Sequence, residues 1–480
     1  MRLGQTSVIF FVSKIAGSAI GFLATIYFAR TLGEEVLGFY ALVLALVTWL
    51  TFIGSIGWTG AVTKRVSEGN EREEYVTAGT IIIGLLGLSV AIGVFLFREQ
   101  VNAYVGQPVA EFLILIVLAV LFRSLWFSVL KGYHLVHIYA PLSTLKLGVR
   151  STAQISLVLL GFGLTGLLVG YVLGGVFAVI VSIAILRFRP SLPTRDHFSS
   201  LFDYAKFSWL GSIRGRTFDQ VDIIVLGFFV PAGPIGIYSV AWTLSEFLDM
   251  FGRAISNSLF PEMSEIAAQN DPQSVSGLVE DALAFGGLII TPGLVGGTLL
   301  ADRLMAIYGD GFVAGQTVLP ILIAALLIYT YNKQLLNTLN AIDRPDLAFR
   351  ANGVFIVTNV VLNVVLIWQL GWVGAAIATA ISAAVGLVVA YHYASSHVPF
   401  SLPVAEIARQ WTAAIGMGAA VYALRKVGEP YWIADYNAAF VVALVAVGAS
   451  IYFATLFVIS SRFRTTVTNN LPSDVPFLPT

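Results

Sequence analysis

The sequence predicts an all-α polytopic membrane protein with about fourteen transmembrane helices, and two observations support this. Of its 480 residues, 57% are hydrophobic and only 11% are charged, whereas about 25% are charged in a typical soluble domain. Apolar runs of roughly 20 residues, long enough to cross a bilayer as helices, recur along the chain. These runs are continuous, whereas strands of a transmembrane barrel would alternate in polarity over about ten residues.

Charge and cysteine content exclude several classes of site. The formal net charge is zero and cysteine is absent. A balanced charge argues against a nucleic-acid partner, and a chain without cysteine has neither disulfides nor thiolate metal sites. The first apolar stretch, residues 6–29, is interrupted by Lys14 and is too long for a signal peptide, so we expect it to be the first span.

The remaining spans follow the apolar runs in order. Pro292 and Pro320 fall inside the ninth and tenth spans and are expected to bend them. The predicted spans are residues 6–29, 36–58, 76–97, 109–130, 141–163, 164–187, 207–230, 235–259, 278–300, 313–336, 346–369, 372–393, 405–424 and 436–460.

The distribution of Lys and Arg predicts the orientation of the chain. An even number of spans places both termini on one side of the membrane. The connections and tails on that side carry fifteen Lys and Arg residues, against five on the other side. Because cytoplasmic connections are enriched in Lys and Arg, both termini are expected to be cytoplasmic.

A proline-rich polar segment, residues 189–206, is expected to link two lobes of six helices. The predicted lobes are residues 1–188 and 207–393, and residues 394–480 add helices 13 and 14 and a cytoplasmic tail. Two motifs recur in matching positions and predict pseudo-symmetric lobes, whose interface is the usual binding site in such transporters. Gly38-Phe-Tyr40 returns 198 residues later as Gly236-Ile-Tyr238, and Gly163-Leu-Thr-Gly166 returns 208 residues later as Gly371-Trp-Val-Gly374.

The predicted seventh span carries four charges within nine residues, namely Arg214, Arg216, Asp219 and Asp222. A charge at membrane depth costs about 2.5–3.5 kcal/mol and normally faces a bundle interior or a water-filled cavity. We therefore expect this helix to form one wall of a transport cavity.

Seven cations lie inside the predicted spans, each in the cytoplasmic half of its helix. One interpretation is that they snorkel to the headgroups or pair with nearby acids, which suits Lys146 and Arg253 best. The other is a basic cavity open to the cytoplasm that holds an anionic headgroup, because Arg binds phosphate through two parallel hydrogen bonds. The candidate substrate-binding residues are Lys14, Arg123, Arg150, Arg214, Arg216 and Arg253.

Four acids are also embedded: Asp219, Asp222, Glu246 and Asp249. They can form intrahelical pairs, such as Arg216 with Asp219 and Asp249 with Arg253. Alternatively, they take up a proton or a sodium ion, as intramembrane carboxylates do in coupled carriers. No other cofactor and no metal site is expected.

The sequence contains no catalytic constellation. A Gly-rich phosphate loop with Gly-Lys-Ser/Thr is missing, and His134 and His137 have no further ligand set around them. We therefore expect a transporter and not an enzyme.

Several segments, taken in order, resemble one family. Phe28-Ala-Arg-Thr-Leu-Gly33 with Val36-Leu-Gly-Phe-Tyr40 resembles the first-loop signature of polysaccharide-type (Wzx-like) flippases. These belong to the multidrug/oligosaccharidyl-lipid/polysaccharide exporter superfamily. Asp222-Ile-Ile-Val-Leu-Gly227, Ile235-Gly-Ile-Tyr-Ser-Val-Ala241 and Leu259-Phe-Pro-Glu-Met-Ser264 are similar to its span seven to eight region, and Leu339-Asn-Ala-Ile-Asp-Arg-Pro345 with Asn359-Val-Val-Leu-Asn363 to its span ten to eleven hairpin.

The resemblance implies two six-helix lobes around a central cavity, with two extra C-terminal helices, working by alternating access. It implies translocation of a sugar or oligosaccharide, linked to an isoprenoid phosphate or pyrophosphate, from the cytoplasmic to the outer leaflet for polysaccharide or glycoprotein assembly. Cationic cavity residues would contact the phosphates. The expected partners are membrane lipids and glycan-assembly enzymes, and the expected setting is a monomer in a prokaryotic plasma membrane.

Two alternatives remain at this point. An ion-coupled cation or drug antiporter of the same superfamily predicts a net acidic cavity, whereas here seven embedded cations face four acids. A membrane glycosyltransferase or polymerase would need acidic catalytic residues in a sizeable outer loop, and the predicted outer connections are short.

Overall fold

The computed structural model describes residues 3–55, 57–212, 220–269, 272–431 and 435–470. Helices dominate these residues, which contain no strand, and this confirms the predicted all-α class. Nine helices in the described part are long and apolar enough to cross a membrane by length and composition alone. The charged helices between them occupy other predicted spans, so the fold has about fourteen transmembrane helices.

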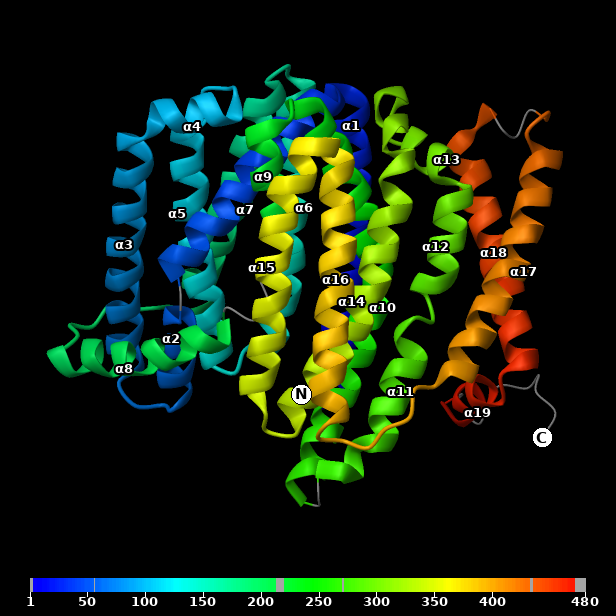
Figure 1. Ribbon diagram of the computed structural model, residues 1–480. Helices are drawn as coiled ribbons and strands as arrows, with labels where there is room; N and C mark the ends of the chain where they lie inside the picture. Colours follow the sequence, from blue (N-terminus) through cyan, green and yellow to red (C-terminus); the bar gives the residue numbers. More distant parts are fainter. Residues whose placement is uncertain (1–2, 56, 213–219, 270–271, 432–434, 471–480) are drawn as a thin grey trace. The chain divides into compact units, whose positions relative to one another are not determined.

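The chain divides into two compact units, Met1–Ser239 and Val240–Thr480. In the first unit, α6 packs along α7 and α1, and α5 packs against α3 and α7. Its helices are α1 (Leu3–Ser55), α2 (Trp58–Ser67), α3 (Arg72–Leu96), α4 (Arg98–Val105), α5 (Ala110–Gly132), α6 (Val136–Leu159), α7 (Gly163–Leu186), α8 (Arg195–Ser212), α9 (Val221–Phe229) and the start of α10 (Ala232–Gln269) (Figure 1).

In the second unit, α16 packs against both α14 and α15, and α17 packs against α18 and α12. The predicted division into residues 1–188, 207–393 and 394–480 stays a prediction. The helices of this unit after α10 are η2 (Pro272–Val275), α11 (Ser276–Gly286), α12 (Ile290–Leu299), α13 (Ala301–Ala306), η3 (Asp310–Thr317), α14 (Leu319–Ala341), α15 (Pro345–Leu370), α16 (Trp372–Ser395), α17 (Val404–Gly428), α18 (Asn437–Ile459) and α19 (Ser461–Asn470).

The first two predicted spans are joined without a loop. Helix α1 runs through both of them and is interrupted only at Gly33, where φ is 78° and ψ is 177°. Glycine adopts this conformation readily because it has no Cβ. A single glycine therefore replaces the connection of several residues expected between the predicted spans 6–29 and 36–58.

The predicted span over residues 207–230 is not one continuous helix. The described part of α8 runs to Ser212, and α9 begins at Val221, after Gln220 with φ of 85°. A residue with this φ cannot continue a right-handed helix. Helix α8 also starts within the predicted linker, at Arg195, and lies against α2 and α3, crossing the direction of α3 (Figure 1).

The two prolines behave differently from each other. The ninth span is interrupted as predicted, since α11 ends at Gly286 and α12 begins at Ile290, two residues before Pro292. The predicted bend at Pro320 is wrong. Pro320 lies in the first turn of α14, where its missing N–H removes no helical hydrogen bond.

Three consecutive helices of the first unit recur in the second. Helices α5, α6 and α7 start at Ala110, Val136 and Gly163, and α14, α15 and α16 each start 209 residues later. The turns agree as well: His134 has φ of 60° and Asp343, 209 residues on, has φ of 59°. These matches support the predicted internal repeat.

Close packing of α6 on α7 depends on glycines spaced four apart on α7. A Cβ at Gly170 would lie 2.4 Å from Cγ of Gln154, and a Cβ at Gly174 would lie 2.7 Å from Cβ of Arg150. Small residues at this spacing let two membrane helices approach closely, where packing and polar contacts stabilise the pair.

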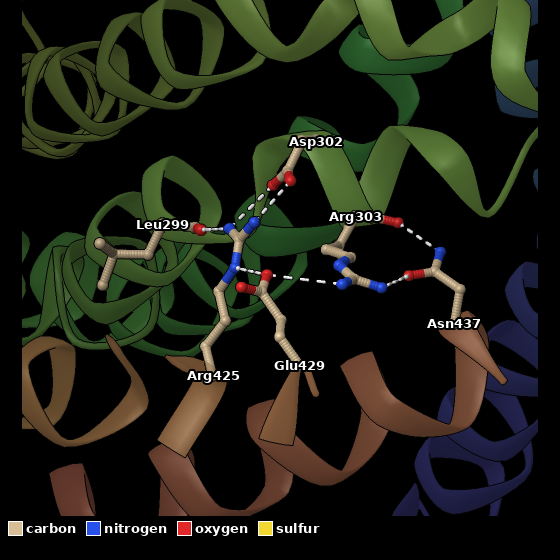
Figure 2. Close-up of polar contacts among 6 residues, drawn as sticks. All are labelled: Leu299, Asp302, Arg303, Arg425, Glu429 and Asn437. Atoms are coloured by element: carbon tan, nitrogen blue, oxygen red, sulfur yellow. Dashed lines mark hydrogen bonds and ion pairs between the residues drawn. The ribbon is translucent and has the colours of Figure 1, made fainter. Parts of the chain in front are cut away.

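Helices α17 and α18 pack onto α12 through an apolar cluster and onto α13 through a polar one. The apolar cluster includes Met417, Val421 and Phe440. In the polar cluster, Arg425 donates to both carboxylate oxygens of Asp302, at 2.9 and 2.6 Å, and to Glu429 at 2.8 Å (Figure 2). Asn437 completes it by donating to the carbonyl of Arg303 at 2.8 Å.

The first prediction concerns the glycines of α7. Gly170→Ala should destabilise the protein by about 1–3 kcal/mol, because the added methyl meets the backbone of α6 as well as Gln154. Gly148→Ala on α6 is the matched control, since a Cβ there meets nothing within 4 Å in the described part of the chain. Thermal unfolding in detergent measures both. Equal midpoints for the two variants would contradict the packing described.

The second prediction concerns Arg425. Arg425→Gln should lower the midpoint of thermal unfolding by roughly 2–4 °C, because the bidentate pair with Asp302 is lost. Lys426→Gln is the control, because Lys426 lies over the ring of Tyr422 on its own helix, 5.0 Å from the centroid, and makes no hydrogen bond to α13 among the described residues. An unchanged midpoint in Arg425→Gln would show that the apolar cluster holds the helix pair alone.

The same pair predicts a pH dependence. Partial burial opposes ionisation of Asp302, but hydrogen bonds from Arg425 and its charge outweigh this and lower the pKa of Asp302. The hydrogen bond from Arg425 also lowers the pKa of Glu429. Carboxylates with lowered pKa values stabilise the folded state at neutral pH and lose this contribution as acid protonates them. The difference in unfolding midpoint between the unmodified protein and Arg425→Gln should therefore shrink as the pH falls below the ordinary pKa values of Asp and Glu, 3.8 and 4.5.

Candidate functional site

Three cations gather in the interior of the first unit. Arg123 comes from α5, and Lys146 and Arg150 come from adjacent turns of α6. All three are half-buried, and Arg123 and Arg150 both lie near enough to Lys146 to repel its charge. The guanidinium of Arg123 also lies over the ring of Phe127, 5.9 Å from its centroid.

Arg150 is the most closely held member of this cluster. Its Nη2 donates to the hydroxyl of Tyr40 at 2.7 Å, and its Nε donates to Oε1 of Gln154 at 3.4 Å. Its guanidinium lies over the ring of Tyr171, 4.2 Å from the centroid. Gln154 in turn donates to the Tyr40 hydroxyl at 3.0 Å and to the Leu167 carbonyl at 2.7 Å. These contacts fix the plane of the guanidinium.

No acid neutralises the cluster within the part of the chain that the structure describes. The ion pairs there involve other residues. Every partner of Arg150 is uncharged, and Nη1 of Arg150 makes no hydrogen bond to a described residue. Three like charges held close together in an apolar bundle favour binding of an anion.

Two embedded acids occupy separate buried positions. Asp222, 6% exposed, lies in the first turn of α9 and accepts a hydrogen bond of 2.6 Å from the hydroxyl of Tyr238. In the second unit, Asp249 is 1% exposed on α10 and accepts from the hydroxyl of Thr330 at 3.1 Å. Glu246 is half-buried one turn before Asp249.

The other predicted site residues cannot be placed. Arg214, Arg216 and Asp219 lie outside the described residues, as do the side chains of Lys14 and Arg253. The expected pairs of Arg216 with Asp219 and of Asp249 with Arg253 therefore stay predictions.

Sequence reasoning missed the three residues that hold Arg150, namely Tyr40, Gln154 and Tyr171. Two signals in the sequence point to them. Gln154 follows Arg150 by one helical turn, and Tyr40 ends one of the recurring Gly-x-Tyr motifs. No comparable signal marks Tyr171, which reaches Arg150 because glycines draw α7 against α6.

The second repeat has asparagines at the positions that match Arg123, Arg150 and Gln154 of the first. The residues 209 positions after Arg123, Arg150 and Gln154 are Asn332, Asn359 and Asn363. All three are buried, with exposed fractions of 1%, 5% and 0%. The Asn363 amide donates to Oδ1 of Asn359 at 3.0 Å, as Arg150 donates to Gln154. These three positions are therefore polar in both copies of the repeat, but only the first copy has positively charged residues there.

The described residues contain no group of three or more His, Asp or Glu side chains that could bind a metal ion. Asp222 and Asp249 each accept a hydrogen bond from a hydroxyl.

Comparison with known proteins identifies relatives over nearly the whole length. A family described as polysaccharide biosynthesis protein matches residues 3–267. "Probable flippase AglR" of Haloferax volcanii is 31% identical over 474 residues, covering 96% of this chain and 97% of that protein. "Probable low-salt glycan biosynthesis flippase Agl15" of the same organism is 28% identical over 409 residues, covering 85% of this chain and 86% of that protein.

Solved structures share the fold at low identity. A structure described as lipid II flippase MurJ in an inward closed conformation has a TM-score of 0.78 and 15% identity, covering 96% of this chain and all of that one. An inward-facing multidrug resistance transporter of the MATE family has a TM-score of 0.61 and 13% identity, covering 79% of this chain and 95% of that one. These likenesses are to the fold alone.

Proposed function

Because the chain belongs to the polysaccharide biosynthesis protein family, we propose that it is a flippase for a lipid-linked glycan. Family membership confirms the resemblance to polysaccharide-type flippases found in the motifs. The substrate would be a sugar or oligosaccharide linked to an isoprenoid phosphate or pyrophosphate, moved from the cytoplasmic to the outer leaflet. The observation that carries this proposal is the uncompensated cluster of Arg123, Lys146 and Arg150.

The chemistry of the cluster matches a phosphate headgroup. A guanidinium presents parallel N–H donors that fit two phosphate oxygens. A lysine ammonium adds a compact positive charge whose donors can rotate toward any phosphate oxygen. Arg150 is held rigidly by uncharged partners, so its remaining donors need little reorganisation to bind an anion. An apolar surrounding strengthens this attraction relative to water.

A transporter also agrees better with the relatives than an enzyme does. The two Haloferax volcanii proteins are named probable flippases, and the solved structure with the higher TM-score is described as a lipid II flippase. The alternative of a cation or drug antiporter is less supported, because a cluster of three positive charges repels an organic cation. A glycosyltransferase or polymerase has no support among these relatives.

The chain is a multi-pass membrane protein. We propose that it lies in the prokaryotic plasma membrane with both termini in the cytoplasm, as the distribution of Lys and Arg predicts. The three cations of the cluster lie near the middle of α5 and α6. We further propose that the protein works as a monomer by alternating access and that glycan-assembly enzymes are its partners.

Coupling to a proton or a sodium ion belongs to the same proposal. Asp222 and Asp249 are buried carboxylates, and each accepts a hydrogen bond from a hydroxyl, of Tyr238 and Thr330 respectively. Intramembrane carboxylates are rare, face the interior of a helix bundle, and mark ion pathways in coupled carriers. Asp219 and Glu246 are the further candidates. Lys14, Arg214, Arg216 and Arg253 remain candidates for headgroup binding.

The third prediction tests the cation cluster. The purified protein is reconstituted in vesicles with a fluorescent isoprenoid-phosphate-linked sugar, and leaflet exchange is followed with a membrane-impermeant quencher. Arg150→Gln should slow exchange by about tenfold or more, because a charge-assisted hydrogen bond is worth about 1.5–3 kcal/mol. Arg123→Gln should also slow it, and this variant loses no hydrogen bond within the described part of the protein.

Two controls make this prediction specific. Arg350→Gln removes an exposed cation of α15 and should leave exchange unchanged. Arg150→Lys keeps the charge but loses the fork, so its rate should fall between those of the unmodified protein and Arg150→Gln. Unchanged exchange in both Arg150→Gln and Arg123→Gln would remove the cluster from the mechanism. Uptake of a small organic cation without lipid exchange would favour the antiporter.

The fourth prediction tests ion coupling. With a proton or sodium gradient imposed across the vesicles, exchange by the unmodified protein should accelerate. Asp222→Asn keeps an acceptor for Tyr238 but loses the charge, so it should abolish the acceleration and retain exchange without a gradient. Asp203→Asn, which affects an exposed pair with Lys206, is the control. A full gradient response in Asp222→Asn would exclude Asp222 as the coupling acid.

A further inference from the structure

The two recurring Gly-x-Tyr motifs contact each other in the first unit. A Cβ at Gly38 would lie 1.8 Å from the carbonyl oxygen of Ala232, and a Cβ at Gly236 would lie 2.0 Å from the carbonyl oxygen of Glu34. Neither distance leaves room for any side chain. The backbones of α1 and α10 therefore touch directly at these two glycines.

This contact is reciprocal. Glu34 is four residues before Gly38, and Ala232 is four residues before Gly236. Each glycine thus meets the carbonyl one turn before the other glycine. The same pair of contacts in both directions is the signature of a local two-fold axis, here within one chain and between the matching motifs of the repeat.

The tyrosine of each motif binds a charged residue. The Tyr40 hydroxyl accepts hydrogen bonds from Arg150 at 2.7 Å and from Gln154 at 3.0 Å. The Tyr238 hydroxyl donates to Asp222 at 2.6 Å. Both tyrosines are buried, with exposed fractions of 9% and 1%. One tyrosine therefore contacts a cation of the proposed headgroup site, and the other contacts a candidate coupling acid.

We propose that the paired Gly-x-Tyr motifs form one positioning device, in which the glycine contact between α1 and α10 places Tyr40 on Arg150 and Tyr238 on Asp222. Each tyrosine follows its glycine by two residues, about 3 Å along the same helix, so its hydroxyl moves with the contact. Tyr40 and Tyr238 are positioning residues for phosphate binding and for ion coupling, and this inference rests on the proposed function.

A shared contact has a specific consequence. A change at Tyr40 alone affects Arg150, and a change at Tyr238 alone affects Asp222. A change at either glycine shifts both helices and affects both sites together. A merely structural role would instead lower stability without separating the two properties in this way.

The fifth prediction measures two readouts on the full-length protein. The first is thermal stabilisation by geranylgeranyl phosphate relative to geranylgeraniol, which lacks the phosphate. The second is the acceleration of leaflet exchange by an imposed ion gradient. Tyr40→Phe should weaken phosphate-dependent binding by about threefold to tenfold and keep the gradient response. Tyr238→Phe should keep the binding and reduce the gradient response.

The glycine variants complete the test. Gly38→Ala and Gly236→Ala should each weaken both readouts. In the double variant Gly38→Ala with Gly236→Ala, each readout should fall by less than the sum of the two single losses, because one backbone shift accommodates both methyls. The matched controls lie on α1. They are Gly21→Ala, where a Cβ meets no described atom within 4 Å, and Tyr27→Phe, whose hydroxyl makes no hydrogen bond to a described residue. Both controls should behave as the unmodified protein.

The outcomes separate the inference from the proposed function. No phosphate-dependent stabilisation of the unmodified protein would overturn the proposed function and this inference with it. Stabilisation of the unmodified protein that is equal in Tyr40→Phe, Gly38→Ala and the controls would overturn the inference alone. Should Gly38→Ala fail to fold, the two tyrosine variants still decide, because Phe keeps the ring and removes only the hydroxyl.

Discussion

The positive charge of Arg150 inside an apolar helix bundle is the constraint on which the first unit depends. Burying an ion costs several kcal/mol unless polar groups surround it, and here Tyr40, Gln154 and Tyr171 do so from three helices. They reach it because the glycines of α7 draw that helix against α6. The partners stabilise the guanidinium without neutralising it, so the charge remains for an anion.

The internal repeat explains how one chain combines two kinds of polar site. Helices α5 to α7 and α14 to α16 repeat at 209 residues, down to the left-handed turns at His134 and Asp343. The first copy carries arginines on these turns and the second carries asparagines. The two copies thus share the geometry of their helices but differ in electrostatics, because only the first carries positive charge on these turns.

Much of the fold could be predicted from periodicity and charge, and the errors have local causes. The apolar runs located the spans, but a run does not distinguish a proline that bends a helix from one that begins it, as at Pro320. Nor does it reveal that Gly33 replaces a loop or that Gln220 interrupts a helix, because both depend on a single backbone dihedral. For the site, charge at membrane depth singled out Arg123 and Arg150 but not their uncharged neighbours.

The sequence by itself determined that this chain crosses the membrane many times and contains two related halves. It also determined that cations outnumber acids within the predicted spans. Hydrophobicity, charge and repetition are properties of the residues and need no coordinates. Only the tertiary structure decided which residues meet: that Tyr40 lies on Arg150, 110 positions away, and that Gly38 contacts the turn before Gly236. Such pairings depend on how closely helix backbones approach, and no local pattern in the sequence specifies that distance.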